Sequence, residues 1–87
     1  GVHRALLATR AAWRAQGLRL RAALESVLEG ALRAAGLEVE YAAVRDPERW
    51  GDLGDGPMVR ARALAAARLD GVRLIDNLSL DGPDGAP

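Results

Sequence analysis

The sequence predicts an α+β fold in which two helices pack on a three-stranded antiparallel sheet. Three observations support this prediction. Apolar residues recur at helical spacing over residues 1–35, they alternate with polar residues over residues 37–44, and Asp70-Gly71 separates two further runs as the turn of a β-hairpin does. With 87 residues, the chain makes one small domain that buries only about 60% of its unfolded surface.

The first helix is expected to begin near the N-terminus and to end at Gly17. Val2, Leu6, Thr9 and Trp13 are spaced so that they fall on one face of a helix. We expect this face to be buried, with the Arg residues of the helix flanking it.

The second helix is expected over residues 18–35, with Gly36 as the residue that ends it. Gly30 within this helix costs about 1 kcal/mol relative to Ala, a cost that is tolerable if another backbone packs closely there. The predicted buried face consists of Leu20, Leu24, Val27, Leu28, Ala31 and Ala35.

Residues 37–44 are expected to form the first strand, because apolar and polar residues alternate along it. Asp46-Pro47 ends this strand, and residues 51–57 form a loop that Trp50 anchors. The predicted buried face consists of Leu37, Val39, Tyr41 and Ala43, and the opposite face carries Glu38 and Glu40.

Residues 60–69 carry two conflicting signals. Their Ala and Leu content favours a helix by intrinsic preference, whereas the Asp70-Gly71 turn and the following run 72–78 favour a strand. We predict a strand, because β-propensity depends on context. Small Ala side chains on a central strand would also let the helices approach the sheet closely.

Composition excludes several classes of protein. The formal net charge is zero and the chain has no Cys, so it has no disulfide scaffold, no thiolate chemistry and no Cys-based zinc site. No apolar run approaches the ~20 residues of a membrane span, and no signal-peptide pattern opens the chain. We expect a cytoplasmic protein that does not act at a membrane.

The basic residues are concentrated in the first third of the chain. Residues 1–33 contain six Arg against two Glu, and a basic helical face could contact phosphates. No aromatic interleaving or nucleic-acid motif accompanies them, so we interpret them as a solvated helix surface or one that faces an acidic neighbour, and expect no nucleic-acid partner. Residues 1–80 are expected to form the domain, and residues 81–87, rich in Gly and Pro, a flexible tail.

An ordered set of motifs resembles a known enzyme family. The motifs are Gly36-Leu37-Glu38-Val39-Glu40-Tyr41, Val44-Arg45-Asp46-Pro47, and Ala66-Ala67-Arg68-Leu69 followed after the turn by Arg73-Leu74-Ile75-Asp76-Asn77. Their order and separations resemble the C-terminal part of pantothenate synthetase (pantoate–β-alanine ligase). The likeness covers roughly His3 to Leu78 and leaves out residues 81–87.

The resemblance implies a small lid domain of an ATP-dependent ligase that condenses pantoate with β-alanine through pantoyl adenylate, in pantothenate and coenzyme A biosynthesis. It also implies that the intact enzyme uses ATP and Mg²⁺ and is a homodimer. The partner of this domain would then be the catalytic N-terminal half of the same enzyme.

None of the catalytic residues of that family can be placed on this chain. The family uses a His-x-Gly-His signature, a Lys-containing segment and a Ser-Ser-Arg-Asn-like loop. This chain has a single His, His3, no Lys, and two Ser residues, Ser26 and Ser79, that are not followed by Arg-Asn. We therefore assign no catalytic, cofactor-binding or metal-binding residue and expect the 87-residue chain to be inactive alone.

Arg73, Asp76 and Asn77 are weak candidates either for contacts across a domain junction or for a structural role. Asp76 lies within an apolar run and would need a partner if buried. Arg45, Arg68 and Arg73 are the candidates for that partner, because Arg and a carboxylate form bidentate pairs.

Other sets of polar residues are interpreted as surface. Ser79, His3 and Asp76 could form a nucleophilic site only on paper, because His3 is expected to be exposed at a helix start. The acidic pairs Glu38/Glu40 and Glu25/Glu29 are expected to be solvated, and the glycine-rich run Gly51–Gly56 lacks the Lys of a phosphate loop.

The alternative to a ligase lid is a freestanding small α+β module that serves binding or assembly without catalysis. A lid separated from its partner should expose an apolar patch along a sheet or helix face and tend to self-associate. An autonomous module should remain monodisperse.

Overall fold

The computed structural model describes residues 1–48 and 56–82. The predicted anchor Trp50, most of the predicted loop and the glycine-rich run therefore lie outside the described residues, as does most of the predicted tail. Asp81 lies within them and contacts the domain, because its Oδ1 accepts a hydrogen bond from the N–H of Ala61 at 2.8 Å.

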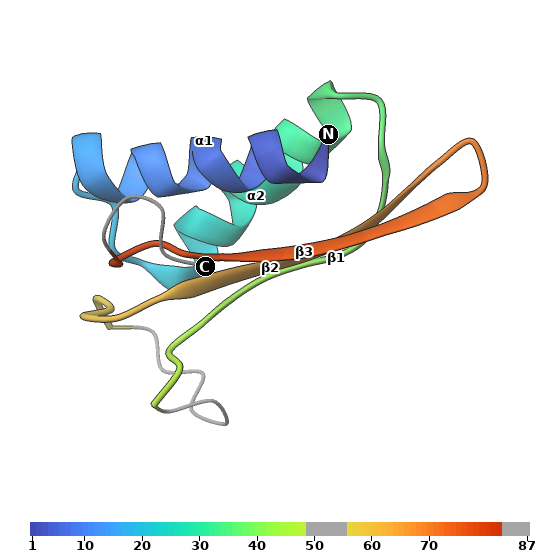
Figure 1. Ribbon diagram of the computed structural model, residues 1–87. Coiled ribbons are helices and arrows are strands. Elements are labelled where there is room, and N and C mark those ends of the chain that lie inside the picture. The colour runs from blue at the N-terminus through green and yellow to red at the C-terminus, as the bar shows by residue number, and fades with distance from the viewer. Residues whose placement is uncertain (49–55, 83–87) are drawn as a thin grey trace.

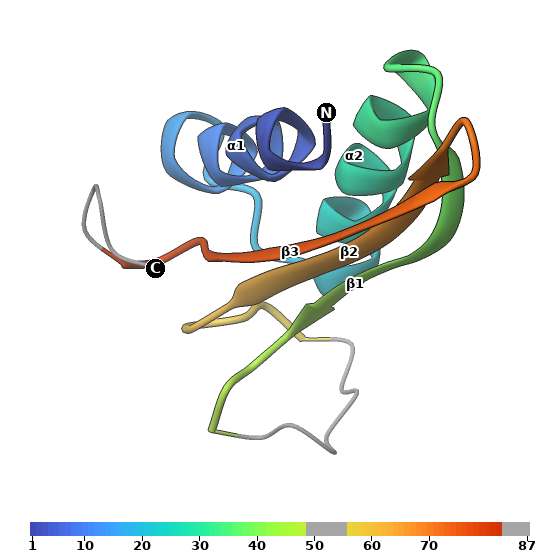
Figure 2. The ribbon, with the colours of Figure 1, turned by 45° about the vertical axis from the view of Figure 1, so that its right-hand side comes forward.

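Two helices and three strands make up two layers. The helices are α1 (Val2–Ala15) and α2 (Arg21–Ala34), and the strands are β1 (Glu38–Arg45), β2 (Arg62–Leu69) and β3 (Val72–Ser79). The strands form one antiparallel sheet in the order β1-β2-β3, and both helices lie on the same face of it (Figures 1 and 2). The predicted α+β architecture is confirmed.

The buried face of α1 agrees with the predicted spacing. Val2, Leu6, Thr9 and Trp13 are all buried, together with two Ala residues of the same face. The fully buried hydroxyl of Thr9 donates to the carbonyl oxygen of Ala5 at 2.9 Å. The polar atom of this side chain is thereby satisfied within the helix.

Helix α2 begins three residues later than predicted, because residues 18–20 make other contacts. Leu20 is extended, with φ −83° and ψ 129°, and forms an isolated β-bridge with Pro57. The carbonyl oxygen of Arg19 accepts a hydrogen bond from the N–H of Met58 at 2.8 Å. The prediction that Leu20 is buried was wrong, since it is 47% exposed.

The buried face of α2 consists of Leu24, Leu28 and Leu32. Leu32 was missed in the sequence, and Ala35 is exposed rather than buried. No other backbone packs closely on Gly30, because a Cβ added there would meet nothing within 4 Å. The helix stops as predicted at Gly36, whose φ is +81°, a left-handed conformation that glycine adopts readily.

A β-bulge changes the predicted pattern of β1. Val39 pairs with Ala67 and Tyr41 pairs with Ala66, which leaves Glu40 as an extra residue. Past the bulge the side chains exchange faces, so Val44 is buried and Tyr41 is 42% exposed. The prediction for the start of the strand was confirmed, but the predicted burial of Tyr41 and of Ala43 on the same face was wrong.

Strands β2 and β3 form the predicted hairpin. Asp70 and Gly71 have φ of 52° and 82°, so both central residues have the positive φ of a type I′ turn. Ala63, Ala65 and Ala67 of the central strand are fully buried in the core. The strand prediction for this Ala-rich segment is confirmed.

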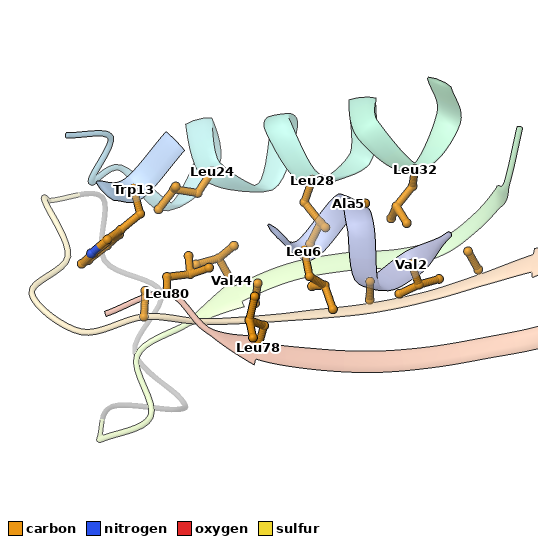
Figure 3. Close-up of a cluster of buried hydrophobic side chains, with 14 of the residues drawn as sticks. Val2, Ala5, Leu6, Trp13, Leu24, Leu28, Leu32, Val44, Leu78 and Leu80 are labelled. Carbon is orange, nitrogen blue, oxygen red and sulfur yellow. The ribbon is translucent and has the colours of Figure 1, made fainter. Parts of the chain in front are cut away.

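The core lies between the helix layer and the sheet (Figure 3). Its side chains come from both ends of the chain as well as from the middle. Leu80, beyond β3, is fully buried, and its N–H donates to the carbonyl oxygen of Ala61 at 2.9 Å. The larger labelled members are Val2, Leu6, Trp13, Leu24, Leu28, Leu32, Val44, Leu78 and Leu80.

Candidate functional site

The three candidate residues of β3 do not form one site. Alternate residues of a strand point to opposite faces, and Leu78 of β3 is buried under the helices. Asp76 therefore shares the helix-covered face, whereas Arg73 and Asn77 lie on the face turned away from the helices. Each of the three has its own partner.

Arg73 belongs to a three-residue ionic cluster centred on the bulge residue Glu40. Arg73 Nε donates to Glu40 Oε1 at 2.8 Å, and Arg68 Nε donates to Glu40 Oε2 at 2.6 Å. Arg68 and Arg73 are paired directly across the hairpin, where like charges repel each other. The carboxylate shared by the two guanidinium groups offsets that repulsion.

The same contacts change the acidity of Glu40. The hydrogen bond from Arg68 lowers the pKa of Glu40 most, and the bond from Arg73 and both positive charges lower it further, against a partial desolvation that acts to raise it. The side chain of Glu40 is 26% exposed. Glu38 and Glu40 are both exposed, as expected, but Glu40 also holds two Arg side chains.

Asp76 lies close to His3, which was expected only to be an exposed residue at the start of a helix. His3 Nδ1 lies 3.4 Å from Asp76 Oδ2, and Asp76 Oδ1 accepts a hydrogen bond from the N–H of Asn77 at 2.8 Å. The side chain of Asp76 is 41% exposed and that of His3 65% exposed. Asp76 is thus not the buried carboxylate that would need an Arg partner, and the predicted exposure of His3 is confirmed.

Asn77 and Ser79 complete the outer face of β3. Arg62 Nη1 donates to Asn77 Oδ1 at 2.5 Å, across the strand pair. Ser79 Oγ accepts a hydrogen bond from the N–H of Gly82 at 3.0 Å. Because Ser79 and Asp76 lie on opposite faces of β3, the set Ser79, His3 and Asp76 is not assembled as a nucleophilic site.

Glu25 is a polar centre that sequence reasoning missed. Its Oε2 accepts hydrogen bonds from the backbone N–H of Val44 at 2.8 Å and from Arg45 Nη1 at 2.7 Å. Its Oε1 accepts from Arg21 Nη1 at 3.0 Å. With its side chain 21% exposed, Glu25 fastens α2 to the edge of the sheet. The expectation of a solvated Glu25/Glu29 pair holds only for Glu29, which is 51% exposed.

Several Arg residues of the basic first third are engaged within the domain. The guanidinium of Arg19 lies 3.8 Å from the centre of the Trp13 ring and donates to the carbonyl oxygens of Trp13 and Leu18. Arg14 donates to the carbonyl oxygen of Gly82. Arg14 and Arg19 therefore contact their own domain, a role that the interpretation as a solvated surface did not include.

Curated relatives of this chain share one name. A protein of Rubrobacter xylanophilus, named pantothenate synthetase, is 45% identical over 86 residues, which cover 84% of this chain and 28% of the relative. A protein of Stenotrophomonas maltophilia with the same name is 44% identical over 77 residues, which cover 88% of this chain and 26% of the relative. No family model matches the chain.

Solved structures lead to the same family. A pantothenate synthetase structure from Thermus thermophilus has 38% sequence identity and a TM-score of 0.70, and covers 91% of this chain. A second structure of the same name and source gives a TM-score of 0.71. The chain belongs to the pantothenate synthetase family. It corresponds to the C-terminal part of these proteins and spans 28% of the length of the solved pantothenate synthetase chain.

The described part of this pantothenate synthetase fragment offers no metal-binding cluster. No group of three or more His, Asp or Glu residues among residues 1–48 and 56–82 is placed to hold a metal ion. Glu25 and Glu40 each hold Arg side chains instead. These residues do not fit a Mg²⁺ site. Neither described helix has the length and apolar character needed to cross a bilayer.

The outer face of the sheet carries apolar side chains that the helices do not cover. Ala66 lies between Tyr41 and Ile75 in the register. Tyr41 is 42% exposed and Ile75 58% exposed. Ala66 itself is fully buried, so the exposed apolar side chains lie on either side of it.

Proposed function

We propose that this chain is the C-terminal lid domain of an ATP-dependent ligase that condenses pantoate with β-alanine through pantoyl adenylate, in pantothenate and coenzyme A biosynthesis. The observation that carries the proposal is the similarity to pantothenate synthetase structures. It extends over 91% of this chain at 38% identity, while this chain accounts for 28% of the solved protein. The rest of the enzyme would supply the catalytic half.

The residues of the domain support a mechanical role. Several of its charged side chains hold the fold, as in the cluster of Glu40 with Arg68 and Arg73 and in the contacts of Glu25. A lid that closes over a nucleotide site keeps water away from an acyl adenylate and completes the binding pocket. The domain alone would then be inactive.

ATP, Mg²⁺ and the dimer contact belong, in this proposal, to the intact enzyme. The metal would be held outside the described residues of this chain, since these provide no suitable cluster. We further propose that the intact enzyme is a cytoplasmic homodimer whose catalytic N-terminal half is the partner of this lid.

The proposal is tested with the complete product of the source gene. The purified full-length protein should form pantothenate from pantoate, β-alanine and ATP, and it should restore growth of a cell that lacks pantothenate synthetase. Two controls are the 87-residue chain and the full-length protein with the segment matching this chain deleted. We expect both to be inactive. Pantothenate formation by the 87-residue chain alone would overturn the proposal that catalysis requires the rest of the enzyme.

The native mass of the gene product distinguishes this proposal from a freestanding binding or assembly module. A product several times longer than the present chain agrees with the lid assignment. A product that begins near Gly1 and stays monodisperse in solution would favour the module and remove the ligase assignment.

A further inference from the structure

The tripeptide Leu-Asp-Gly occurs twice in the chain, in two different settings. Leu69-Asp70-Gly71 lies at the tip of the β2–β3 hairpin, which projects beyond the helices (Figure 1). Leu80-Asp81-Gly82 follows β3 and lies against the core, because Leu80 is fully buried. Leu69, by contrast, is 45% exposed. The same three residue types are therefore exposed at one place and held at the other.

An Asp-Gly pair can isomerise without an enzyme. The backbone nitrogen of Gly attacks the side-chain carbon Cγ of Asp, and a succinimide ring closes as the N–H proton and the carboxyl OH leave together as one water. Water then reopens the ring at either of its two carbonyl groups. One product is Asp again, and the other is isoaspartate, in which the main chain runs through Cγ. The reaction needs a Gly nitrogen that is free to attack and a carboxyl group that is free to turn toward it.

Both reacting groups are unrestrained at the hairpin tip. Gly71 lies beyond the last strand pair, which joins Leu69 to Val72. Neither the N–H of Gly71 nor the carboxylate of Asp70 has a hydrogen-bond partner among residues 1–48 and 56–82. Asp70 is exposed and has a φ of 52°, a left-handed conformation that is unfavourable for a residue with a Cβ. Opening of the turn relieves that strain.

The tip is also the part of the sheet that opens most easily. Ring closure changes the backbone at Asp70, so the turn must open for the reaction to proceed. Exposed segments with few buried contacts open at a low cost in free energy, and Val72 beside the turn is 59% exposed. The ionic cluster of Glu40 with Arg68 and Arg73 joins the strands at the next residue pair. Opening is therefore confined to the tip.

The second Leu-Asp-Gly tripeptide has both reacting groups engaged. Asp81 Oδ1 accepts a hydrogen bond from the N–H of Ala61 at 2.8 Å, and Asp81 Oδ2 lies 3.6 Å from Arg60 Nε. The N–H of Gly82 donates to Ser79 Oγ at 3.0 Å. The side chain of Asp81 is only 22% exposed. The carboxyl group and the nitrogen must each leave a partner before a ring can close here.

We propose that Asp70 is a site of spontaneous isoaspartate formation and that the contacts of Asp81 and Gly82 protect the second site. This inference does not depend on the proposed function. Isoaspartate at position 70 adds one carbon atom to the main chain of the turn. A type I′ turn connects its strands through two residues of ordinary length, so the modified tip no longer closes and the pairing of Leu69 with Val72 is lost first.

The experiment uses the full-length gene product, kept folded for several weeks at physiological temperature and mildly acidic pH. After proteolysis, mass spectrometry with electron-transfer fragmentation distinguishes isoaspartate from Asp in the peptides that contain positions 70 and 81. We expect isoaspartate to form at least about tenfold faster at position 70, since two hydrogen bonds must break at position 81. The same incubation in guanidinium chloride is the control, because both tripeptides should react at similar rates once the protein is unfolded.

Ser79→Ala provides a matched variant. It removes the acceptor of the Gly82 N–H, so isoaspartate should form faster at position 81 while the rate at position 70 stays unchanged. No change at position 81 would exclude the protective role of that hydrogen bond. The comparison of the two positions in the native chain needs no substitution and decides the proposal even if the variant does not fold. Equal rates at both positions in the folded protein, a faster rate at position 81, or no isoaspartate at position 70 would each overturn it.

Discussion

The carboxylate of Glu25 on α2 accepts a hydrogen bond from the backbone N–H of Val44 on β1, at 2.8 Å. Strand β1 is an edge strand of the sheet, and the free N–H groups of edge strands can pair with strands of other chains. At Val44 a helix side chain occupies that donor. Arg45 and Arg21 hold the carboxylate in place from two sides.

Replacing Glu25 should therefore destabilise the domain much more than replacing its neighbour on the same helix. Glu25→Ala removes the acceptor of the Val44 N–H and the carboxylate that Arg21 and Arg45 contact, and we expect a loss of about 1–3 kcal/mol in the free energy of unfolding. Glu29→Ala removes one exposed ion pair with Arg33 and should cost at most about 0.5 kcal/mol. Urea denaturation measures both. Equal losses for the two variants would contradict the role of Glu25.

Gly30→Ala should stabilise the domain. The glycine lies within α2, and a Cβ there meets nothing within 4 Å, so the substitution gains helix propensity of up to about 1 kcal/mol without a clash. Gly36→Ala is the control, because the same addition at φ +81° forces a left-handed conformation on Ala and should destabilise by about 1 kcal/mol. A thermal melt in which both variants shift in the same direction would be inconsistent with this account.

Stability should depend on pH through Glu40. Its pKa is lowered in the folded protein below the ordinary value of 4.5, so the ionised carboxylate stabilises the fold above the unfolded pKa, and this contribution is lost as the pH falls through the folded pKa. Glu40→Gln should lower the urea midpoint at pH 7, and its difference from the native chain should shrink as the pH falls below the ordinary pKa of a Glu side chain. Glu38→Gln, on the same strand, should change the midpoint little. A Glu40→Gln difference that grows in acid would exclude this mechanism.

Enlarging the central strand beneath the helices should also be unfavourable. Ala65 is fully buried in the core, and Ala65→Leu would overpack it at a cost of about 1–3 kcal/mol. Ala43→Leu adds the same atoms on the outer face of the edge strand, where Ala43 is only half-buried, and we expect a change within about 0.5 kcal/mol. Equal losses in the free energy of unfolding at both positions, measured by chemical denaturation, would contradict the tight packing of the core around Ala65.

The elements themselves could be predicted from the sequence because their signals are local. The spacing of Val2, Leu6 and Trp13 defines one helix face, and Asp70-Gly71 defines the hairpin turn. These features depend on residues within a few positions of each other. The strand assignment of β2 could not be made from its own residues, because their composition favours a helix. It required the Asp70-Gly71 turn and the strand-like run that follows it.

The errors occurred where the structure depends on distant residues. The bulge at Glu40 is accompanied by contacts with Arg68 and Arg73 from two other strands, and nothing within residues 37–44 indicates it. The late start of α2 is coupled to Met58, which bonds to Arg19. A single extra residue in a strand changes the face of every side chain that follows it, so one missed bulge was enough to misplace Tyr41.

For the candidate site residues, too, the local features could be predicted and the long-range contacts could not. Strand alternation alone separates Asp76 from Arg73 and Asn77, so their placement on two faces could have been predicted. Their partners could not, because His3 and Glu40 come from elements far away in the chain. Glu25 could not be identified from its own surroundings either, since its bond to Val44 depends on how α2 packs on the sheet.

The alanines of β2 have a consequence for how the chain folds. They leave room for the helices above the central strand, yet in the unfolded chain the same residues prefer transient helical turns. Forming the sheet must exchange those local hydrogen bonds for bonds to β1 and β3, a conflict between local preference and final fold that slows or diverts folding. Alcohols that strengthen helices should therefore weaken this sheet before they affect α1 or α2.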